Sequence, residues 1–140
     1  MQDHLVRVVS RDGLLRGMVA VTTNLVTEIC RKQQTDFTAT VALGRLLTGG
    51  ALLGCLLKGQ ERLALVVEGS GPLAKLSVET DAEGRVRGSI RNGQAGLPPK
   101  DGRFDVAGAI GKAGFLHVWQ DLGMKKPYQS MVQLQTSEIA

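Results

Sequence analysis

A glycine-rich run between two apolar segments is the stretch of this sequence whose spacing comes closest to a known binding motif. Gly69, Gly71 and Ala74 fit the pattern G-x-G-x-x-A, and an apolar segment that is typical of a strand precedes them. A dinucleotide-binding fold needs a helix directly after this pattern, because the helix N-terminus holds the pyrophosphate. Here residues 73–81 alternate between apolar and polar side chains, which predicts a strand instead. The run is therefore predicted to be a hairpin turn, with nucleotide binding as the less favoured alternative.

Two histidines and two cysteines are the side chains that could bind a metal or act as nucleophiles. His4 and His117 are isolated, and neither has a second ligand at the spacing of a metal site. Cys30 and Cys55 lie on apolar parts of expected helices, where a thiol without a cationic neighbour stays protonated and unreactive. We therefore predict structural roles for the cysteines, strand-surface positions for the histidines, and no catalytic, cofactor-binding or metal-binding residues. The chain is not expected to be an enzyme.

Three arginines and two aromatic residues are the remaining candidates for contact with a partner. Arg85, Arg87 and Arg91 line one face of an expected strand, without the interleaved aromatic side chains that single-stranded nucleic-acid sites use. Because the net charge is only +4, a solvated strand face is favoured over a nucleic-acid interface. Trp119 and Phe115 share one face of a later strand. Core packing is their first interpretation, and an exposed apolar patch is the alternative.

An almost uncharged stretch, residues 38–58, is the element around which these side chains must be arranged. Its pattern predicts a helix with its first residue as the N-cap and Gly59 as the stop signal. From Gly49 onward no polar stripe remains, so this half is expected to be surrounded by protein on every side. Gly50 and Gly54 have the spacing of a membrane-helix contact. A membrane span is therefore the alternative, but the flanking segments resemble those of a soluble α+β protein and favour a buried central helix.

The only charge between the two ends of this helix is Arg45. A guanidinium group on a largely buried helix needs an ion-pair or hydrogen-bond partner, because an unpaired buried charge is strongly destabilising. We expect Glu28, on the preceding helix, to be that partner, with Glu68 as the second choice. The expected role of Arg45 is structural.

The rest of the chain alternates between strand and helix patterns in an order that predicts an α+β fold. A length of 140 residues suits one domain, and 43% hydrophobic with 21% charged residues is typical of a globular protein. The opening residues lack the pattern of a signal peptide, and two widely spaced cysteines indicate a reducing cytosol. Strands are expected at residues 4–10, 14–21, 62–68, 73–81, 85–92, 114–122 and 127–136, helices at 22–34 and 38–58, and one or two helical turns at 104–110.

Three segments of the sequence resemble the heat-shock protein 33 family, the redox-regulated holdase chaperones of bacteria. They are residues 4–26, 43–92 and 116–140, and the resemblance covers essentially the whole chain in register. It implies antiparallel β-sheets packed around central helices, in a β/α/β layered sandwich. It also implies a cytoplasmic protein that holds unfolding client proteins under oxidative and heat stress without ATP. The client-binding residues are not identified by the resemblance.

The zinc switch of that family has no counterpart among these residues. Family members bind zinc through four C-terminal cysteines in CxC and CxxC arrangements, and oxidation releases the metal; Cys30 and Cys55 match neither motif. Zinc is therefore implied only for a full-length family member. Residues 137–140 look like a helix N-cap and a first helical turn that goes no further. We expect residues 1–140 to be a truncated N-terminal chaperone core without the zinc domain.

Two hypotheses of different classes follow from the sequence. The first is a client-binding chaperone core, and the alternative is an inert scaffold or dimerisation module without client binding of its own. For either one we expect a homodimer, with neither a nucleic acid nor a membrane as partner.

Overall fold

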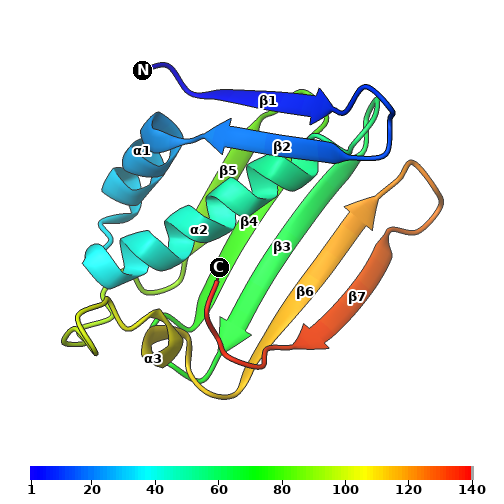
Figure 1. The fold of residues 1–140 in the computed structure, drawn as a ribbon. Helices are drawn as coiled ribbons and strands as arrows, with labels where there is room; N and C mark the ends of the chain where they lie inside the picture. The colour runs from blue at the N-terminus through cyan, green and yellow to red at the C-terminus, as the bar shows by residue number, and fades with distance from the viewer. Residues whose placement is uncertain (140) are drawn as a thin grey trace.

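A five-stranded antiparallel sheet and a two-stranded sheet lie on opposite sides of a long helix (Figure 1). A computed structural model describes residues 1–139 of the chain. The smaller sheet pairs β1 with β2, and the larger sheet has the strand order β5-β4-β3-β6-β7. The elements are β1 (His4–Val9), β2 (Arg16–Val21), α1 (Thr23–Gln33), α2 (Phe37–Gly54), β3 (Arg62–Gly69), β4 (Lys75–Asp81), β5 (Val86–Ile90), α3 (Val106–Ile110), β6 (Gly114–Asp121) and β7 (Tyr128–Gln133).

Helix α2 forms the middle layer of the molecule. It packs against β3, β4 and β5 of the larger sheet on one side and against β2 on the other, with α1 beside it. Each layer contributes apolar side chains to a shared interior, which is how such layered folds are stabilised. The predicted α+β class and the β/α/β layering are therefore confirmed.

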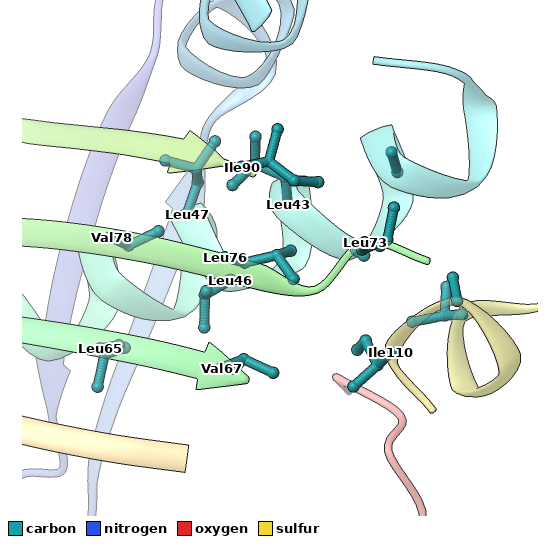
Figure 2. Close-up of a cluster of buried hydrophobic side chains, with 14 of the residues drawn as sticks. Leu43, Leu46, Leu47, Leu65, Val67, Leu73, Leu76, Val78, Ile90 and Ile110 are labelled. Atoms are coloured by element: carbon teal, nitrogen blue, oxygen red, sulfur yellow. The ribbon is translucent and has the colours of Figure 1, made fainter. Parts of the chain in front are cut away.

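The core lies between α2 and the inner face of the five-stranded sheet (Figure 2). Leu43 and Leu47 of α2 are completely buried, and Leu76 and Val78 of β4 are each only 1% exposed. Along β4 the buried residues alternate with more exposed ones, as the period of a strand requires. The alternation predicted for residues 73–81 is confirmed over residues 75–81, whereas Leu73 and Ala74 lie in the turn before β4.

Helix α2 begins earlier and ends earlier than the predicted span of residues 38–58. Its N-cap is Asp36, whose carboxylate accepts a hydrogen bond of 2.9 Å from the backbone N–H of Ala39. An Asp side chain in this position satisfies one of the unpaired N–H groups of the first turn. From Cys55 onward the backbone leaves the helix in a turn, so the following residues do not extend it.

The glycines in the second half of α2 allow the helix to lie directly on β4. A Cβ atom at Gly50 would stand 2.6 Å from a methyl carbon of Val78. A Cβ atom at Gly54 would stand 2.5 Å from the hydroxyl oxygen of Thr80. Only a residue without a side chain fits at such distances. The GxxxG spacing therefore serves contact between a helix and a sheet within the protein.

The second half of α2 is not enclosed on all sides, and the prediction from Gly49 onward was wrong. Leu53 is 40% exposed and Leu56, in the turn that follows, is 60% exposed. Among the described residues α2 is the one helix long and apolar enough to cross a membrane, and 50% of its residues are buried inside the protein. A core helix has the same length and composition, and the contacts of Gly50 and Gly54 with β4 are of that kind.

Arg45 is half-exposed and pairs with a residue that the sequence prediction did not include. Its guanidinium group lies 3.4 Å from the carboxylate of Glu138, and the side chains are 45% and 48% exposed. Glu28 and Glu68, the predicted partners, pair with lysines near them instead. The prediction was wrong because it assumed a buried arginine, whereas this side of α2 faces the C-terminal segment.

The C-terminal segment is attached to the core without forming a helix. Ser137, which is only 3% exposed, donates a 2.5 Å hydrogen bond from its hydroxyl group to the carbonyl oxygen of Gly111. Ile139 packs against the core cluster. Residues 137–139 are irregular, so the predicted helical turn is wrong for them, and Ala140 lies outside the described residues.

Candidate functional site

The outer face of the five-stranded sheet carries every second residue of strands whose other residues form the core. Along β3, Leu63, Leu65 and Val67 are buried, while Ala64 and Val66 between them are only partly buried. The helices lie over the inner face, and Figure 1 shows no element over the outer one among the described residues. A sheet with one face in the core and the other accessible to a partner is a common antiparallel arrangement.

Large apolar side chains are exposed along β6 and β7 on this outer face. Phe115 and Trp119 of β6 are 39% and 42% exposed, and His117, partly buried, lies between them. Met131 of β7, opposite His117 in the register, is 61% exposed. These four side chains form what we call the aromatic stripe. Its exposure favours the second interpretation of Phe115 and Trp119, an apolar surface patch rather than core.

A cleft of about 580 Å³ opens at the end of the aromatic stripe. Trp119 and Pro127 provide apolar wall, while Arg62 of β3 and Asp121 of β6 provide charge. A smaller hollow of about 330 Å³ shares Arg62 and Asp121 with it. The cleft therefore joins an apolar wall to a charged end within one concave surface.

Two ion pairs, formed by β4 with β5 and with the turn before β5, lie at the charged end of the cleft. The Asp81 carboxylate lies 2.7 Å from the Nε of Arg85, and Glu79 accepts a 2.8 Å hydrogen bond from the Nε of Arg87. Desolvation alone would raise the pKa of Asp81. Hydrogen bonds from the Arg85 side chain and from the backbone N–H groups of Arg85 and Glu83 outweigh it, and the pKa of Asp81 is lowered. Both carboxylates are thus paired with arginines of the same surface, as is expected for the solvated strand face that the sequence predicts.

Arg62 and Asp121 are less fully engaged than these pairs. They are direct cross-strand neighbours in the register of β3 and β6, and Arg62 also stands opposite Asp81 on β4. Within residues 1–139 neither Arg62 nor Asp121 forms an ion pair. Asp121 accepts one hydrogen bond of 3.0 Å, from the N–H of Gly123. Both groups retain capacity for a ligand.

The glycine-rich run that resembled a nucleotide-binding loop is the turn between β3 and β4. The N–H of Gly71 donates to the carbonyl oxygen of Ile110, and that of Ser70 donates to Ala113. A Cβ atom at Gly69 or Gly71 would collide with the backbone of α3. The N–H groups that would bind a phosphate are therefore used inside the fold, and the hairpin prediction is confirmed.

The cysteines and histidines do not come together. Cys30 is buried in α1, whereas Cys55 lies at the C-cap of α2 and is only partly buried. His4 is exposed on β1, and His117 lies on the outer face of β6. Within residues 1–139 no three His, Cys, Asp or Glu side chains gather closely enough to hold a metal ion.

A second apolar surface lies on the two-stranded sheet. Val6 and Val8 of β1 and Val19 of β2 share one face and are 46%, 56% and 63% exposed. The opposite face is turned toward α2, since Arg7 donates a 3.2 Å hydrogen bond to the carbonyl oxygen of Cys55. We call these three residues the valine face.

The sequence prediction missed the cleft because its parts come from strands that are distant in the chain. Alternation along each strand placed Arg87 on a solvated strand face and Trp119 on the same strand face as Phe115, but it could not show which strands are neighbours. The order β4-β3-β6 brings Asp81, Arg62 and Asp121 side by side. The available signal was the charge at one end of each strand, in residues 62, 81 and 121.

Fold and site together define a layered α+β domain with an accessible apolar sheet face and, in the part of the chain described, no gathered set of metal ligands. The family model for the Hsp33 protein matches residues 3–140. This chain belongs to the Hsp33 family.

Relatives and a solved structure agree with this assignment. The chain is 61% identical to the 33 kDa chaperonin of Syntrophotalea carbinolica over 100% of this chain and 49% of that protein. It is 56% identical to the 33 kDa chaperonin of Geobacter sulfurreducens, over 99% of this chain and 46% of that protein. The crystal structure of the 33 kDa chaperonin of Thermotoga maritima has a TM-score of 0.89 at 36% identity, covering 95% of this chain and 46% of that one. The chain thus spans about half the length of the relatives it matches.

Proposed function

We propose that this chain is the core of an ATP-independent holdase chaperone that binds unfolding proteins in the cytoplasm. The observation that carries the proposal is the aromatic stripe, where Phe115, Trp119 and Met131 stand exposed on a rigid sheet face. Unfolding proteins expose apolar surface, and burial of such surface is favourable without directional contacts. Membership of the Hsp33 family and the name 33 kDa chaperonin of the relatives support the same function.

Binding without nucleotide and without catalysis fits the same residues. The backbone N–H groups of the glycine-rich turn donate hydrogen bonds to α3 and to the residues that follow it, so they are not free to bind the phosphates of ATP. A partner held by apolar surface needs no acid, base or nucleophile. Under this proposal the chain holds clients and changes no covalent bond.

Light scattering of a heat-unfolded client protein, under reducing conditions, tests this function. We expect the chain to suppress aggregation of the client, and we expect Phe115→Ser and Met131→Ser to weaken that suppression while the protein stays folded. Leu53→Ser, at an apolar position on α2 that is about as exposed as Phe115, is the matched control. A monomeric, folded chain that leaves aggregation unchanged in molar excess would remove the proposal.

The alternative, an inert scaffold or dimerisation module, is favoured by a different surface. Val6, Val8 and Val19 leave an apolar face on the two-stranded sheet, and exposed apolar faces mark association sites. A second copy of the chain is the partner we propose for the valine face, because a two-fold dimer pairs identical surfaces. Sedimentation of the wild type and of Val8→Lys tests it. A wild type that sediments as a monomer contradicts the homodimer.

We also predict that this chain binds no stoichiometric zinc and has no peroxide switch. A structural zinc site needs four ligands in tetrahedral geometry, and Cys30 and Cys55 lie in different surroundings of the fold. Elemental analysis of the purified protein measures the first expectation. Peroxide treatment followed by the client assay measures the second, and one zinc per chain would contradict the prediction.

A further inference from the structure

Two residues in the cleft at the end of the aromatic stripe, Trp119 and Asp121, are spaced to hold one long side chain. Trp119 and Asp121 lie two residues apart on β6 and therefore on the same face. A strand advances about 3.4 Å per residue, so their Cα atoms are about 7 Å apart. That separation matches a side chain whose apolar stem lies on the indole ring while its charged end reaches the carboxylate.

The charge around the cleft favours a cation. The cleft and the hollow next to it are lined by five carboxylates and three guanidinium groups, in a chain whose net charge is +4. Arg85 pairs with Asp81 and Glu83, and Arg87 pairs with Glu79. Among the described residues, two carboxylates, those of Asp121 and Glu61, therefore have no ion pair, whereas Arg62 is the one guanidinium group without an ion pair. The carboxylates that line the two hollows are those of residues 61, 79, 81, 83 and 121, and the guanidinium groups are those of residues 62, 85 and 87.

The aromatic wall of the cleft also favours a cation. The face of an indole ring is electronegative and attracts an ammonium or guanidinium group. Trp119 is 42% exposed and has no aromatic partner within the described part of the chain. Pro127 and Ala64 extend the apolar wall beside it.

We propose that this cleft is a subsite for a lysine or arginine side chain of an extended polypeptide. The stem of that side chain lies across Trp119, and its charged group pairs with Asp121. Arg62, opposite Asp81 and Asp121 on its neighbouring strands, is the like charge that the bound cation meets there. This inference rests on the proposed client binding and adds a chemical preference to it. Apolar segments that contain a positively charged side chain bind more tightly than those that contain a negatively charged one.

The single tryptophan of the chain makes the test specific, because Trp119 itself lines the cleft. The probes are three blocked peptides, acetyl-Gly-Leu-Lys-Val-Gly-amide and its counterparts with Gln or Glu in place of Lys. Binding is followed by Trp119 fluorescence and by the one indole N–H resonance in a nitrogen-15 spectrum. We expect the Lys peptide to bind about two- to fivefold more tightly than the Gln peptide, the value of one partly exposed ion pair, and the Glu peptide to bind most weakly. The difference should shrink at 1 M salt, since salt screens exposed charges.

Two variants at the cleft should change the affinity for the Lys peptide in opposite directions. Unfolding of a variant could only lower this affinity. Asp121→Asn keeps an oxygen for the N–H of Gly123 and should remove the preference for Lys over Gln. Arg62→Gln removes a like charge and should increase the affinity for the Lys peptide about twofold or more. Asp101→Asn makes the same chemical change as Asp121→Asn in an exposed loop outside both hollows and should leave binding unchanged.

The outcomes separate this inference from the proposed function. If the three peptides bind equally, if the Glu peptide binds most tightly, or if the indole resonance never moves, the subsite is wrong even when client aggregation is suppressed. If the Lys peptide binds with the expected order but aggregation of the client is unchanged, the subsite stands and the holdase function is wrong.

Discussion

The two faces of the five-stranded sheet are built from alternate residues of the same strands, yet they have opposite surroundings. On β3, Val67 is 2% exposed in the core, while its neighbour Val66 lies on the outer face and is only partly buried. The inner face packs against α2 and carries the buried core residues of β3 and β4. The outer face retains exposed aromatic side chains and a cleft. The comparison indicates that one side of the sheet forms the core and that the other is the accessible surface on which we propose binding.

Adjacent valines give the largest expected contrast. Val67→Ala removes buried carbon atoms and leaves a cavity, so we expect the free energy of unfolding to fall by about 2–3 kcal/mol. Val66→Ala makes the same change on the outer face, and we expect less than about 1 kcal/mol. Urea unfolding of both variants measures the difference. Equal losses would show that the outer face is also packed, and would contradict the division between the faces.

Adjacent glycines provide the same contrast on α2. A Cβ atom at Gly50 would meet Val78 at 2.6 Å, whereas one at Gly49 would have nothing within 4 Å. We expect Gly50→Ala to destabilise the protein by about 1–2 kcal/mol through overpacking. Gly49→Ala should stabilise it by about 0.5–1 kcal/mol, because alanine is the better helix former. The midpoints of thermal unfolding provide the measurement, and a stabilising Gly50→Ala would contradict the close contact with β4.

Removal of the charge of Arg45, on the side of α2 that faces the C-terminal segment, should change the free energy of unfolding less than the glycine substitutions do. Arg45 and Glu138 form a half-exposed ion pair, and such pairs contribute about 0–1 kcal/mol. We expect Arg45→Met to change the free energy of unfolding within that range and to leave client binding intact. Chemical denaturation and the client assay check both parts. Loss of holdase activity in a folded Arg45→Met protein would place a binding surface on α2 as well.

The smallest expected effect is a pH dependence at the edge of the cleft. The pKa of Asp81 is lowered in the folded protein from its ordinary value of 3.8, with desolvation outweighed by hydrogen bonds from Arg85 and the nearby backbone. The stabilisation from this carboxylate is therefore complete above the ordinary pKa and is lost as the pH falls through the lowered value. We expect Asp81→Asn to flatten the acid side of the stability profile slightly. Urea midpoints of both proteins between neutral and strongly acid pH measure this, and an unchanged profile would contradict it.

Much of the fold could be predicted from local patterns, because each pattern depends on near neighbours in the chain. The period of two placed β3, β4, β5, β6 and β7, and the apolar helical pattern of residues 38–58 placed α2 to within a few residues of its observed ends. The failures at Arg45 and in the second half of α2 have a common cause: each concerned contacts between distant segments. The partner of Arg45 comes from the C-terminal segment, and the exposure of Leu53 depends on what lies over α2.

The candidate site was less predictable than the fold for the same reason. Trp119 could be assigned to a strand face, but the cleft exists only because β3 stands between β4 and β6. Asp121 has no predicted role beyond its place in the strand expected at residues 114–122. Its position beside Arg62 requires the pairing of two strands that are far apart in the sequence.

The central position of β3 also has a consequence for how the chain folds while it is synthesised on the ribosome. One edge of β3 is covered by β4, the next strand in the chain, but the other is covered only by β6, from Arg62 opposite Asp121 to Gly69 opposite Gly114. Until β6 has been synthesised, an apolar strand exposes unpaired N–H and C=O groups, the kind of edge that recruits other chains. Pairing between strands distant in sequence is also slow, because the intervening chain must first be ordered. A nascent chain that stops before β6 is therefore expected to be prone to aggregation, and so to become a client for chaperones before it can serve as one.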